Sequence, residues 1–190
     1  MTEHEKMLAG QLYDANDPAL TALRLRAKEL CWEFERLRPS ETAARTALLR
    51  RLLGGMGEDV VILDPFRCDY GENITIGSHF FANHGLTILD CAQVSFGDHV
   101  FIGPDCGFYT AGHPMDAERR NRGMEYARPI RVGNDVWLGG GVRVLPGVCI
   151  GDRCVIGAGS VVTRDIPPDS VAAGSPCRVL RPITDADRTL

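Results

Sequence analysis

Residues 132–167 read VGNDVW LGGGVR VLPGVC IGDRCV IGAGSV VTRDIP, six consecutive units of six residues each. The first position of every unit is aliphatic, and the fifth position is aliphatic or small. A period of six matches neither the 3.6-residue period of an α-helix nor the two-residue alternation of a long strand. It fits a short strand and a tight turn, with aliphatic residues pointing inward and Gly, Asp or Asn in the turn. Repeats of this kind predict a parallel β-helix.

The period also predicts which residues stack on one another. Three units would form one coil, so residue i would lie beside residue i+18, about 4.8 Å away in the next coil. Val132 should then stack on Ile150, and Leu138 on Ile156. A glycine-rich β-sandwich is the alternative, but a sandwich would not keep a strict period of six.

A second block of repeats precedes the first. Apolar residues recur at intervals of six in two groups, Ile76, Ala82 and Ile88, then Phe96, Ile102 and Phe108. The step from Ile88 to Phe96 is eight, so the register slips by two residues there. Between Thr110 and Arg128 the pattern disappears and the chain is polar, which predicts a loop excluded from the repeat.

The first part of the chain has a helical pattern instead. Asp17 followed by Pro18 is typical of a helix start, and apolar residues then recur at spacings of three and four until Pro39. Further helices are indicated over residues 43–53 and 3–9. We therefore expect a helical segment over residues 1–58 and a β-helix over residues 59–182, with an excursion loop over 111–128 and a C-terminal tail.

Composition limits the class of protein. The 190 residues are 44% hydrophobic and 24% charged, as in ordinary globular chains, and the net charge of −4 argues against a nucleic-acid binder. No apolar run reaches the roughly 18–20 residues that span a bilayer, and the polar start does not resemble a secretory signal. Seven cysteines, an odd number without a C-x-x-C motif, favour a reducing, cytoplasmic setting. Two of them, Cys149 and Cys154, occupy repeat positions and are expected to be buried.

The chain resembles the maltose and galactoside O-acetyltransferases over roughly residues 5–182. The resemblance rests on the stretches EKMLAGQLYDANDPAL, FRCDYGENITIG, FFANHGLTILD, TAGHPMD, VGNDVWLGG and AAGSPCRVLR. It implies a mainly β fold, a left-handed parallel β-helix, and transfer of an acetyl group from acetyl-CoA to a sugar hydroxyl. It also implies a homotrimer with active sites between subunits. From the composition and the histidine pattern we expect no metal, nucleic-acid or membrane partner.

Acetyl transfer to a hydroxyl needs a base, because a neutral alcohol is a poor nucleophile. A free histidine has a pKa near ~6.5 and can accept that proton at neutral pH. The resemblance assigns this role to His113, which would otherwise be a surface-loop histidine. Glu125, in the same loop, is either the carboxylate that orients the imidazole or a solvated charge. No activated Ser or Cys adjoins His113, which predicts direct transfer without an acyl-enzyme.

The resemblance also suggests binding residues. Acceptor contacts are expected from Asp17, Asp69, Asn83 and Asp90, and the choice between Asp14 and Asp17 stays open because Asp17 also suits a helix cap. The amide of Gly140 is the candidate donor to the tetrahedral oxyanion. Contacts with acetyl-CoA are expected from Gly140, Ala158, Thr163, Arg164, Arg178 and Arg181. Trp137 would pack against the cofactor arm or against a neighbouring coil.

Three other functions remain as alternatives. A hexapeptide-repeat acetyltransferase with an antibiotic or serine as acceptor would share most of these features. A zinc carbonic anhydrase of the same fold needs three imidazoles, and His79 and His84 supply only part of that pattern; His79 and His99 fit turn positions better. A non-catalytic trimeric scaffold would not need the GHP loop or the C-terminal arginines.

Overall fold

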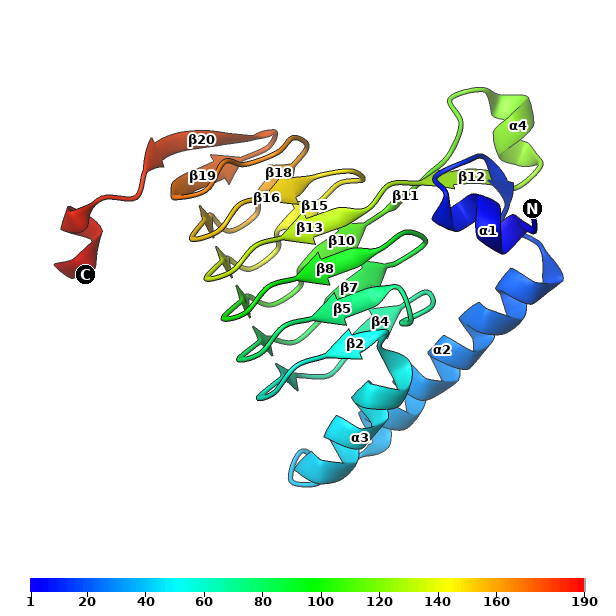
Figure 1. Cartoon of the computed structure of the whole chain (residues 1–190), viewed down its shortest axis with the longest axis horizontal. Helices are drawn as coiled ribbons and strands as arrows, with labels where there is room; N and C mark the ends of the chain where they lie inside the picture. The colour runs from blue at the N-terminus through cyan, green and yellow to red at the C-terminus, as the bar shows by residue number, and fades with distance from the viewer. Residues whose placement is uncertain (190) are drawn as a thin grey trace.

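Short parallel strands stack in three sheets around one apolar interior in the computed structural model, which describes residues 1–189 (Figure 1). Face 1 comprises β2 (Gly55–Met56), β5 (Ile74–Ile76), β8 (Val94–Phe96), β13 (Ile130–Val132) and β16 (Cys149–Ile150). Face 2 comprises β3 (Val61–Ile62), β6 (Phe81–Ala82), β9 (Phe101–Ile102), β14 (Trp137–Leu138), β17 (Val155–Ile156), β19 (Ser170–Gly174) and β20 (Cys177–Pro182). Face 3 comprises β4 (Phe66–Cys68), β7 (Leu86–Leu89), β10 (Gly107–Tyr109), β15 (Arg143–Val144) and β18 (Val161–Val162). The expected fold class, a left-handed parallel β-helix of hexapeptide repeats, is confirmed.

Three corners join these faces, and they differ in the residues that form the turn. We call the turn from face 1 to face 2 the histidine corner, because it holds His79 and His99. The turn from face 2 to face 3 is the glycine corner, which includes residues 139–141 and 157–159. The turn from face 3 to face 1 is the excursion corner, because the chain between β10 and β13 leaves the coils there.

Strand register confirms the predicted stacking in the later coils. Val132 pairs with Ile150 and Leu138 with Ile156, each eighteen residues on. The earlier coils are longer: Ile76 pairs with Phe96, twenty residues on. The two additional residues of each earlier coil lie at the excursion corner, because the other steps in those coils remain six. The slip seen in the sequence therefore marks the corner from which the excursion later departs.

The repeated aliphatic positions form the core. All six residues at the first position of the units in 132–167 are buried, as are those at the fifth position. Burying one such side chain contributes roughly 1.5–3 kcal/mol, so stacked coils accumulate stability along the axis. The histidine corner needs a left-handed backbone, and non-glycine residues adopt it in successive coils, among them His79 at φ 56° and His99 at φ 55°. Both histidines are thus turn residues, as expected.

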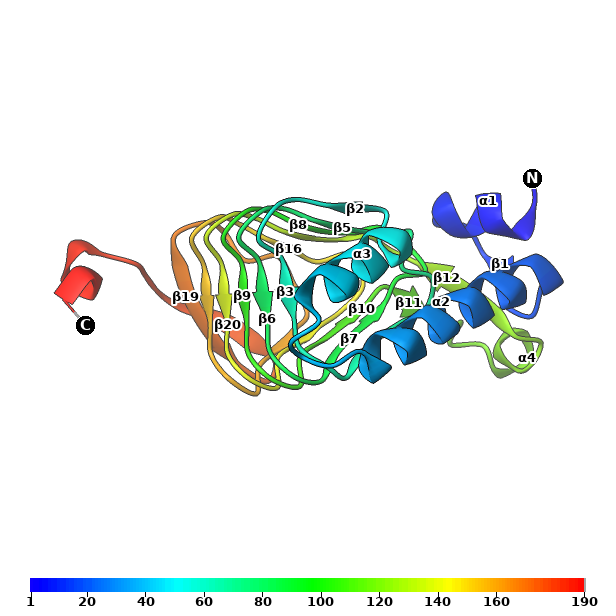
Figure 2. The same ribbon diagram turned by 90° about the horizontal axis from the view of Figure 1, so that it is seen from below.

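The N-terminal helices form where the sequence indicates, with the second and third closing one end of the coils and the first lying beside the excursion (Figures 1 and 2). They are α1 (Glu3–Leu8), α2 (Pro18–Arg36) and α3 (Thr42–Leu52). The Asp17 side chain caps α2 by accepting from the amides of Ala19 and Leu20 at 2.9 and 3.2 Å. Phe34 of α2 and Leu49 of α3 belong to the same buried cluster as the coils. Their apolar faces therefore cover the core at the first coil, which would otherwise meet solvent.

The excursion is more regular than its polar sequence predicts. It contains β11 (Ala111–Gly112), α4 (Ala117–Asn121) and β12 (Met124–Ala127). β12 pairs antiparallel with β11 and with β1 (Tyr13–Asp14), so the order of this small sheet is β1-β12-β11. A loop was predicted because the partner strand β1 comes from the other end of the chain and leaves no local pattern. Figure 1 shows this sheet and α4 projecting from one side of the coils.

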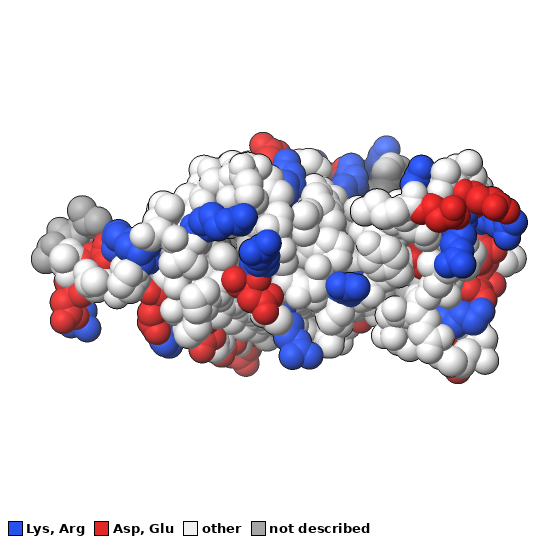
Figure 3. All heavy atoms as spheres, turned by 90° about the horizontal axis from the view of Figure 1, so that it is seen from above, with Lys and Arg blue, Asp and Glu red and all other residues white. Residues whose placement is uncertain are grey.

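The C-terminal part folds back before it leaves the body. β20 pairs antiparallel with β19 on the last coil, and η1 (Asp185–Thr189) follows, projecting from the coils in Figure 1. Charged side chains on the face drawn in Figure 3 are separated by uncharged surface, and both signs occur at either end. No helix among residues 1–189 is both long and apolar enough to cross a membrane.

The cysteines are all unpaired, and six of the seven are buried. Cys154 is buried as expected, but the expectation was wrong for Cys149, which is exposed. Cys149 lies on β16 opposite Arg131, at the outward-pointing position of its strand, whereas the adjacent Ile150 points inward.

Candidate active site at the excursion corner

His113 follows β11, and its imidazole faces the carboxylate of Glu125 on β12. The distance from His113 Nε2 to Glu125 Oε1 is 3.8 Å, within reach of an ion pair but longer than a hydrogen bond. The His113 side chain is 54% exposed and that of Glu125 is 20% exposed. The hairpin therefore brings together the two predicted catalytic residues, with the histidine open to a ligand and the carboxylate behind it.

Tyr13 is a third member of this group that the sequence analysis missed. It lies on β1 directly opposite Glu125, and its hydroxyl donates a hydrogen bond to Glu125 Oε2 at 2.7 Å. The side chain has no exposed surface, and burial raises the pKa of its phenol above the ordinary range. A lone tyrosine before a helix gave no signal, because its partner lies 112 residues away in the sequence.

Asp69 and Cys91 extend the polar cluster toward the coils. The Cys91 thiol, buried at the excursion corner, lies 3.6 Å from Asp69 Oδ2 and donates to it. Burial raises the pKa of Asp69, and repulsion from Glu125 acts in the same direction. The carboxylates of two predicted residues, Asp69 and Glu125, are thus close enough for the charge of one to affect the pKa of the other. Cys91 was not predicted, because nothing in its sequence context distinguishes it from a packing residue.

Asp90 has no exposed surface and acts on neighbouring backbone. Its Oδ1 accepts from the amides of Asp69 and Tyr70 at 3.0 and 2.9 Å, while Oδ2 has no hydrogen-bond partner among residues 1–189. Burial raises the pKa of Asp90 to about 6. The structure therefore places Asp90 behind Asp69 in this chain, where it fixes the backbone rather than facing an open surface.

Both N-terminal candidates for acceptor binding make local hydrogen bonds. Asp17 caps α2, whereas Asp14 Oδ1 accepts from the amide of Asn16 at 2.9 Å. Asp14 lies on β1 opposite Met124, and the amide of Ala15 donates to Gly123 of the excursion. Asp14 is therefore on the strand that joins the excursion, and Asp17 begins the helix that follows.

A second set of predicted residues lies at the glycine corner. Asn83 follows β6, Gly140 follows β14 and Ala158 follows β17, so all three lie at the same corner. Gly140 and Ala158 are in adjacent coils, whereas the coil of β9 separates Asn83 from Gly140. The amide of Gly140 donates to no acceptor among residues 1–189, whereas the neighbouring amide of Gly141 donates to Pro104 at 2.7 Å. A Cβ added at Gly159 would meet no atom within 4 Å. This corner offers a free amide beside open surface, which fits an extended ligand lying along it.

Thr163 and Arg164 lie at the excursion corner, two coils beyond the one from which the excursion with His113 departs. They line a groove of about 400 Å³ together with Arg128 and Arg131. The two additional arginines come from the return of the excursion and from β13, and the sequence analysis missed them. Three guanidinium groups around one groove suit an anionic ligand such as a phosphate.

Arg178 and Arg181 lie on β20, and their surroundings differ. The Arg178 guanidinium donates to the carbonyl of Cys177 at 2.8 Å. Arg181 forms two hydrogen bonds with Asp187, at 2.8 and 2.6 Å, which lower the pKa of that carboxyl. Arg181 is thus already paired within the chain, so its predicted contact with a ligand would have to compete with Asp187.

Trp137 points outward on face 2 and is 56% exposed. It lies in register between Phe101 and Val155, so it stacks on neighbouring coils. The outward apolar positions of this face form what we call the face 2 ladder, Val61, Phe81, Phe101, Trp137, Val155 and Val171. Three of these residues, Val61, Phe101 and Trp137, are exposed and the others partly so. A continuous apolar surface of this kind is typical of a surface that another molecule covers.

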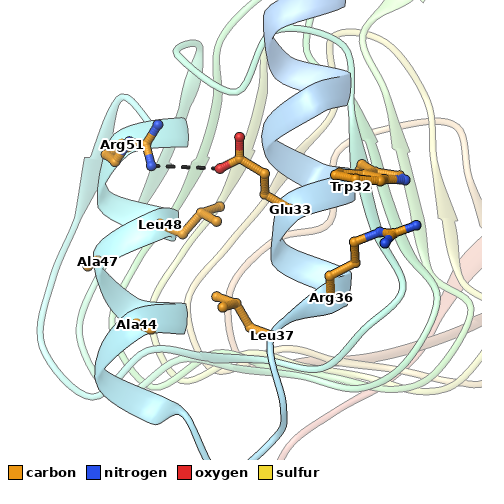
Figure 4. Close-up of a pocket in the computed structure, with 8 residues that line it drawn as sticks. All are labelled: Trp32, Glu33, Arg36, Leu37, Ala44, Ala47, Leu48 and Arg51. Atoms are coloured by element: carbon orange, nitrogen blue, oxygen red, sulfur yellow. Dashed lines mark ion pairs between the residues drawn. The ribbon is translucent and has the colours of Figure 1, made fainter.

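A further groove lies between α2 and α3 (Figure 4). It has a volume of about 480 Å³, and Arg51 and Glu33 approach to 3.8 Å across it. None of the predicted site residues lines it. Among residues 1–189, no group of three or more His, Cys, Asp or Glu side chains is arranged to hold a metal ion.

Comparison with known proteins identifies both parts of the chain. Residues 6–57 match the maltose acetyltransferase hexapeptide capping motif, and residues 129–164 match the bacterial transferase hexapeptide repeats. The galactoside O-acetyltransferase of Escherichia coli K12 is 46% identical over 184 residues, covering 97% of this chain and 91% of that protein.

Solved structures show the same similarity. A galactoside acetyltransferase in complex with coenzyme A superimposes with a TM-score of 0.95 at 45% identity, covering 99% of this chain and 94% of that one. A maltose O-acetyltransferase from Clostridium difficile 630 gives a TM-score of 0.91 at 46% identity, covering 97% of this chain and 99% of the other. Sequence identity at this level over nearly the whole length shows membership of the same family, not only a shared fold.

Proposed function

The chain belongs to the maltose and galactoside O-acetyltransferase family of hexapeptide-repeat transferases. On that premise we propose that it transfers an acetyl group from acetyl-CoA to a sugar hydroxyl, with His113 as general base. One observation carries the proposal. The imidazole of His113 is open on one side and faces the half-buried Glu125 carboxylate at 3.8 Å on the other. This is the arrangement that a base needs when it must accept a proton from a bound hydroxyl.

The proposed reaction is a direct transfer. The hydroxyl proton of the acceptor passes to His113 as the hydroxyl oxygen attacks the thioester carbonyl. The tetrahedral intermediate carries the negative charge on the former carbonyl oxygen, which accepts from the free amide of Gly140. The C–S bond then breaks, the acetyl ester is released, and the CoA sulfur takes the proton from the imidazolium. Glu125 stabilises that imidazolium while it holds the proton.

The site is proposed to lie between subunits of a homotrimer. His113 and Asp69 lie at the excursion corner, whereas Asn83 and Gly140 lie at the glycine corner. Within one chain the run across face 3 separates these corners, and about six extended residues span about 20 Å. A neighbouring copy that presents its glycine corner to the excursion corner would bring the two sets together. The face 2 ladder lies on the strands that lead into the glycine corner, and it supports this contact because it is apolar and Val61, Phe101 and Trp137 are exposed.

Acetyl-CoA is proposed to lie along the glycine corner, with its phosphates reaching arginines. Ala158 and Gly159 leave room for a pantetheine arm, because they carry a methyl group or no side chain. Thr163 and Arg164, with Arg128 and Arg131, provide a basic groove for the nucleotide end, and Arg178 is exposed on the last coil. Arg181 contributes only if Asp187 releases it.

The acceptor is proposed to be a sugar because its hydroxyls would meet short polar side chains. Asp69 and Asn83 are the acceptor contacts that the structure leaves partly exposed, and Asp17 or Asp14 would approach from the N-terminal segment. Asp90 supports Asp69 from behind. A cytoplasmic location is part of the same proposal, since seven free cysteines suit a reducing compartment.

The test is an acetyl-CoA consumption assay on the purified full-length protein with maltose, glucose, galactosides, serine and an aminoglycoside as acceptors. We expect thiol release that depends on a sugar, and an acetylated sugar detected by mass spectrometry. If only serine or only the aminoglycoside supported thiol release, that compound would be the acceptor and the sugar assignment would be wrong. A stoichiometric burst of CoA without any acceptor would contradict direct transfer.

The intersubunit site has its own test. Trimers that mix His113→Ala subunits with Asn83→Ala subunits contain some sites in which both residues are wild type. Partial recovery of activity on mixing is expected if the site is shared between chains. No recovery would place both residues in one subunit.

A further inference from the structure

Tyr13 joins the start of the chain to the candidate catalytic pair. β1 is only two residues long, yet Tyr13 lies opposite Glu125 in its antiparallel pairing with β12. Residues directly opposite each other in such a pair point to the same side of the sheet. The pairing therefore delivers the Tyr13 hydroxyl to the Glu125 carboxylate, and the two groups form a hydrogen bond of 2.7 Å.

The two oxygens of Glu125 face different partners. Oε2 accepts from Tyr13, and Oε1 faces His113 Nε2 at 3.8 Å. The terminal torsion of a glutamate is broad and weakly restrained, so a carboxylate with one free end can turn away from a histidine. A fixed donor at Oε2 removes that freedom and leaves Oε1 directed at the imidazole.

Tyr13 itself is held firmly. It is fully buried in a small cluster that includes Met7, Leu20, Cys91 and Ala127. The amide of Asp14, the next residue, donates to Glu3 Oε2 at 2.6 Å, which ties β1 to α1. Burial raises the pKa of the phenol, so its hydroxyl keeps its proton and remains a donor throughout neutral pH. The ring is thus a rigid support for the carboxylate.

We propose that Tyr13 is a positioning residue that orients Glu125 toward His113 and so makes the N-terminal segment part of the active site. This inference rests on the proposed function, because it assigns Tyr13 a role in acetyl transfer through Glu125. Tyr13 touches neither substrate nor the reacting atoms in this arrangement. Its contribution is to kcat, through the geometry of the base, rather than to binding.

The test compares Tyr13→Phe with Tyr70→Phe in the full-length protein. Both variants remove a buried tyrosine hydroxyl from the same apolar cluster, but the Tyr70 hydroxyl accepts from Arg24 instead of contacting Glu125. We expect Tyr13→Phe to lower kcat about tenfold with KM for both substrates within about twofold. Tyr70→Phe should leave kcat within about twofold, and both variants should keep a folded, cooperative thermal transition.

A double-mutant cycle shows whether Tyr13 acts through Glu125. In a Glu125→Ala background the substitution Tyr13→Phe should cause no further loss, because the carboxylate that it orients is gone. Additive losses, or a Tyr13→Phe variant with wild-type kcat, would overturn the proposal. An active His113→Ala variant would instead overturn the proposed function, so the two failures are distinguishable.

Discussion

Tyr13 and Glu125 meet through a hydrogen bond of 2.7 Å although 112 residues separate them in the sequence. The bond connects a two-residue strand before the first long helix with the return strand of the excursion. The helical segment and the excursion are thus one structural unit around His113. Substitutions around His113 are therefore expected to affect activity, as are substitutions at the glycine corner, whereas substitutions of buried residues on the coils should affect mainly stability.

Replacing His113 with alanine should remove the general base. We expect kcat to fall by about 10²–10⁴-fold, since proton transfer by a positioned side chain contributes that much, with little change in thermal stability because the side chain is exposed. The measurement is acetyl-CoA consumption with the acceptor identified in the panel. His79→Ala is the matched control, because His79 is also half-exposed but lies at the histidine corner. Near-normal turnover of His113→Ala would refute the assignment.

Arg164→Ala should weaken acetyl-CoA binding. Loss of one charge-assisted contact at an exposed groove predicts a rise of about 5–10-fold in KM for acetyl-CoA, with KM for the acceptor unchanged. Initial rates at varied acetyl-CoA and fixed acceptor provide the measurement. Arg50→Ala, on α3 at the other end of the coils, should leave both constants unchanged. An equal rise in the two KM values would argue against a nucleotide contact.

Asp90→Asn should stabilise the protein in a pH-dependent manner. Burial raises the pKa of Asp90 to about 6 from an ordinary value of 3.8, so the folded state binds this proton more tightly than the unfolded state. The wild type should therefore lose stability as pH rises from about 4 to about 6, with no further loss above that window. Asparagine keeps an oxygen acceptor for Asp69 and Tyr70 but does not titrate.

The difference in free energy of unfolding between Asp90→Asn and wild type should accordingly grow by about 3 kcal/mol across that window. Urea unfolding at a series of pH values provides the measurement. The exposed substitution Asp135→Asn serves as the control for a general effect of removing one carboxylate. A difference that stays flat between pH 4 and pH 7 would show that Asp90 carries no such burial penalty.

Gly54→Ala should destabilise the junction between α3 and the first coil. A Cβ at Gly54 would lie 2.0 Å from the carbonyl oxygen of Glu72, so backbone would have to move, at a cost of about 1–3 kcal/mol. At the adjacent Gly55 the nearest atom is the Thr75 methyl at 3.4 Å, which allows an alanine. In thermal unfolding, Gly54→Ala should therefore have a clearly lower transition temperature than Gly55→Ala. Equal transition temperatures would mean that the junction relaxes freely.

Much of the fold could be predicted because the repeat is a local signal. An aliphatic residue at every sixth position specifies a coil of three strands, and the register of Val132 with Ile150 follows from it. Asp17 and Pro18 likewise predicted the start of α2 from neighbouring residues alone. The spacing of eighteen did not hold in the first coils, because additional residues at the excursion corner lengthen each of them to twenty.

The candidate site was less predictable, because its residues are joined by pairing between distant segments. His113 and Glu125 were identified from the GHP motif and the resemblance, but Tyr13 and Cys91 have no pattern that marks them. The sequence likewise did not indicate which of the predicted polar residues would be buried. The resemblance suggested Asp90 as an acceptor contact, yet it lies wholly inside the corner and supports Asp69.

The sequence by itself determined the β-helix, its capping helices and the position of the excursion, because each depends on spacing along the chain. Only the tertiary structure decided that the excursion is a strand pair held by β1, and that the predicted residues divide between two corners. The physical reason is that periodicity records which side chains point inward. It does not record which distant backbone satisfies the hydrogen bonds of a polar segment, nor which corner a turn residue occupies once the coils have closed.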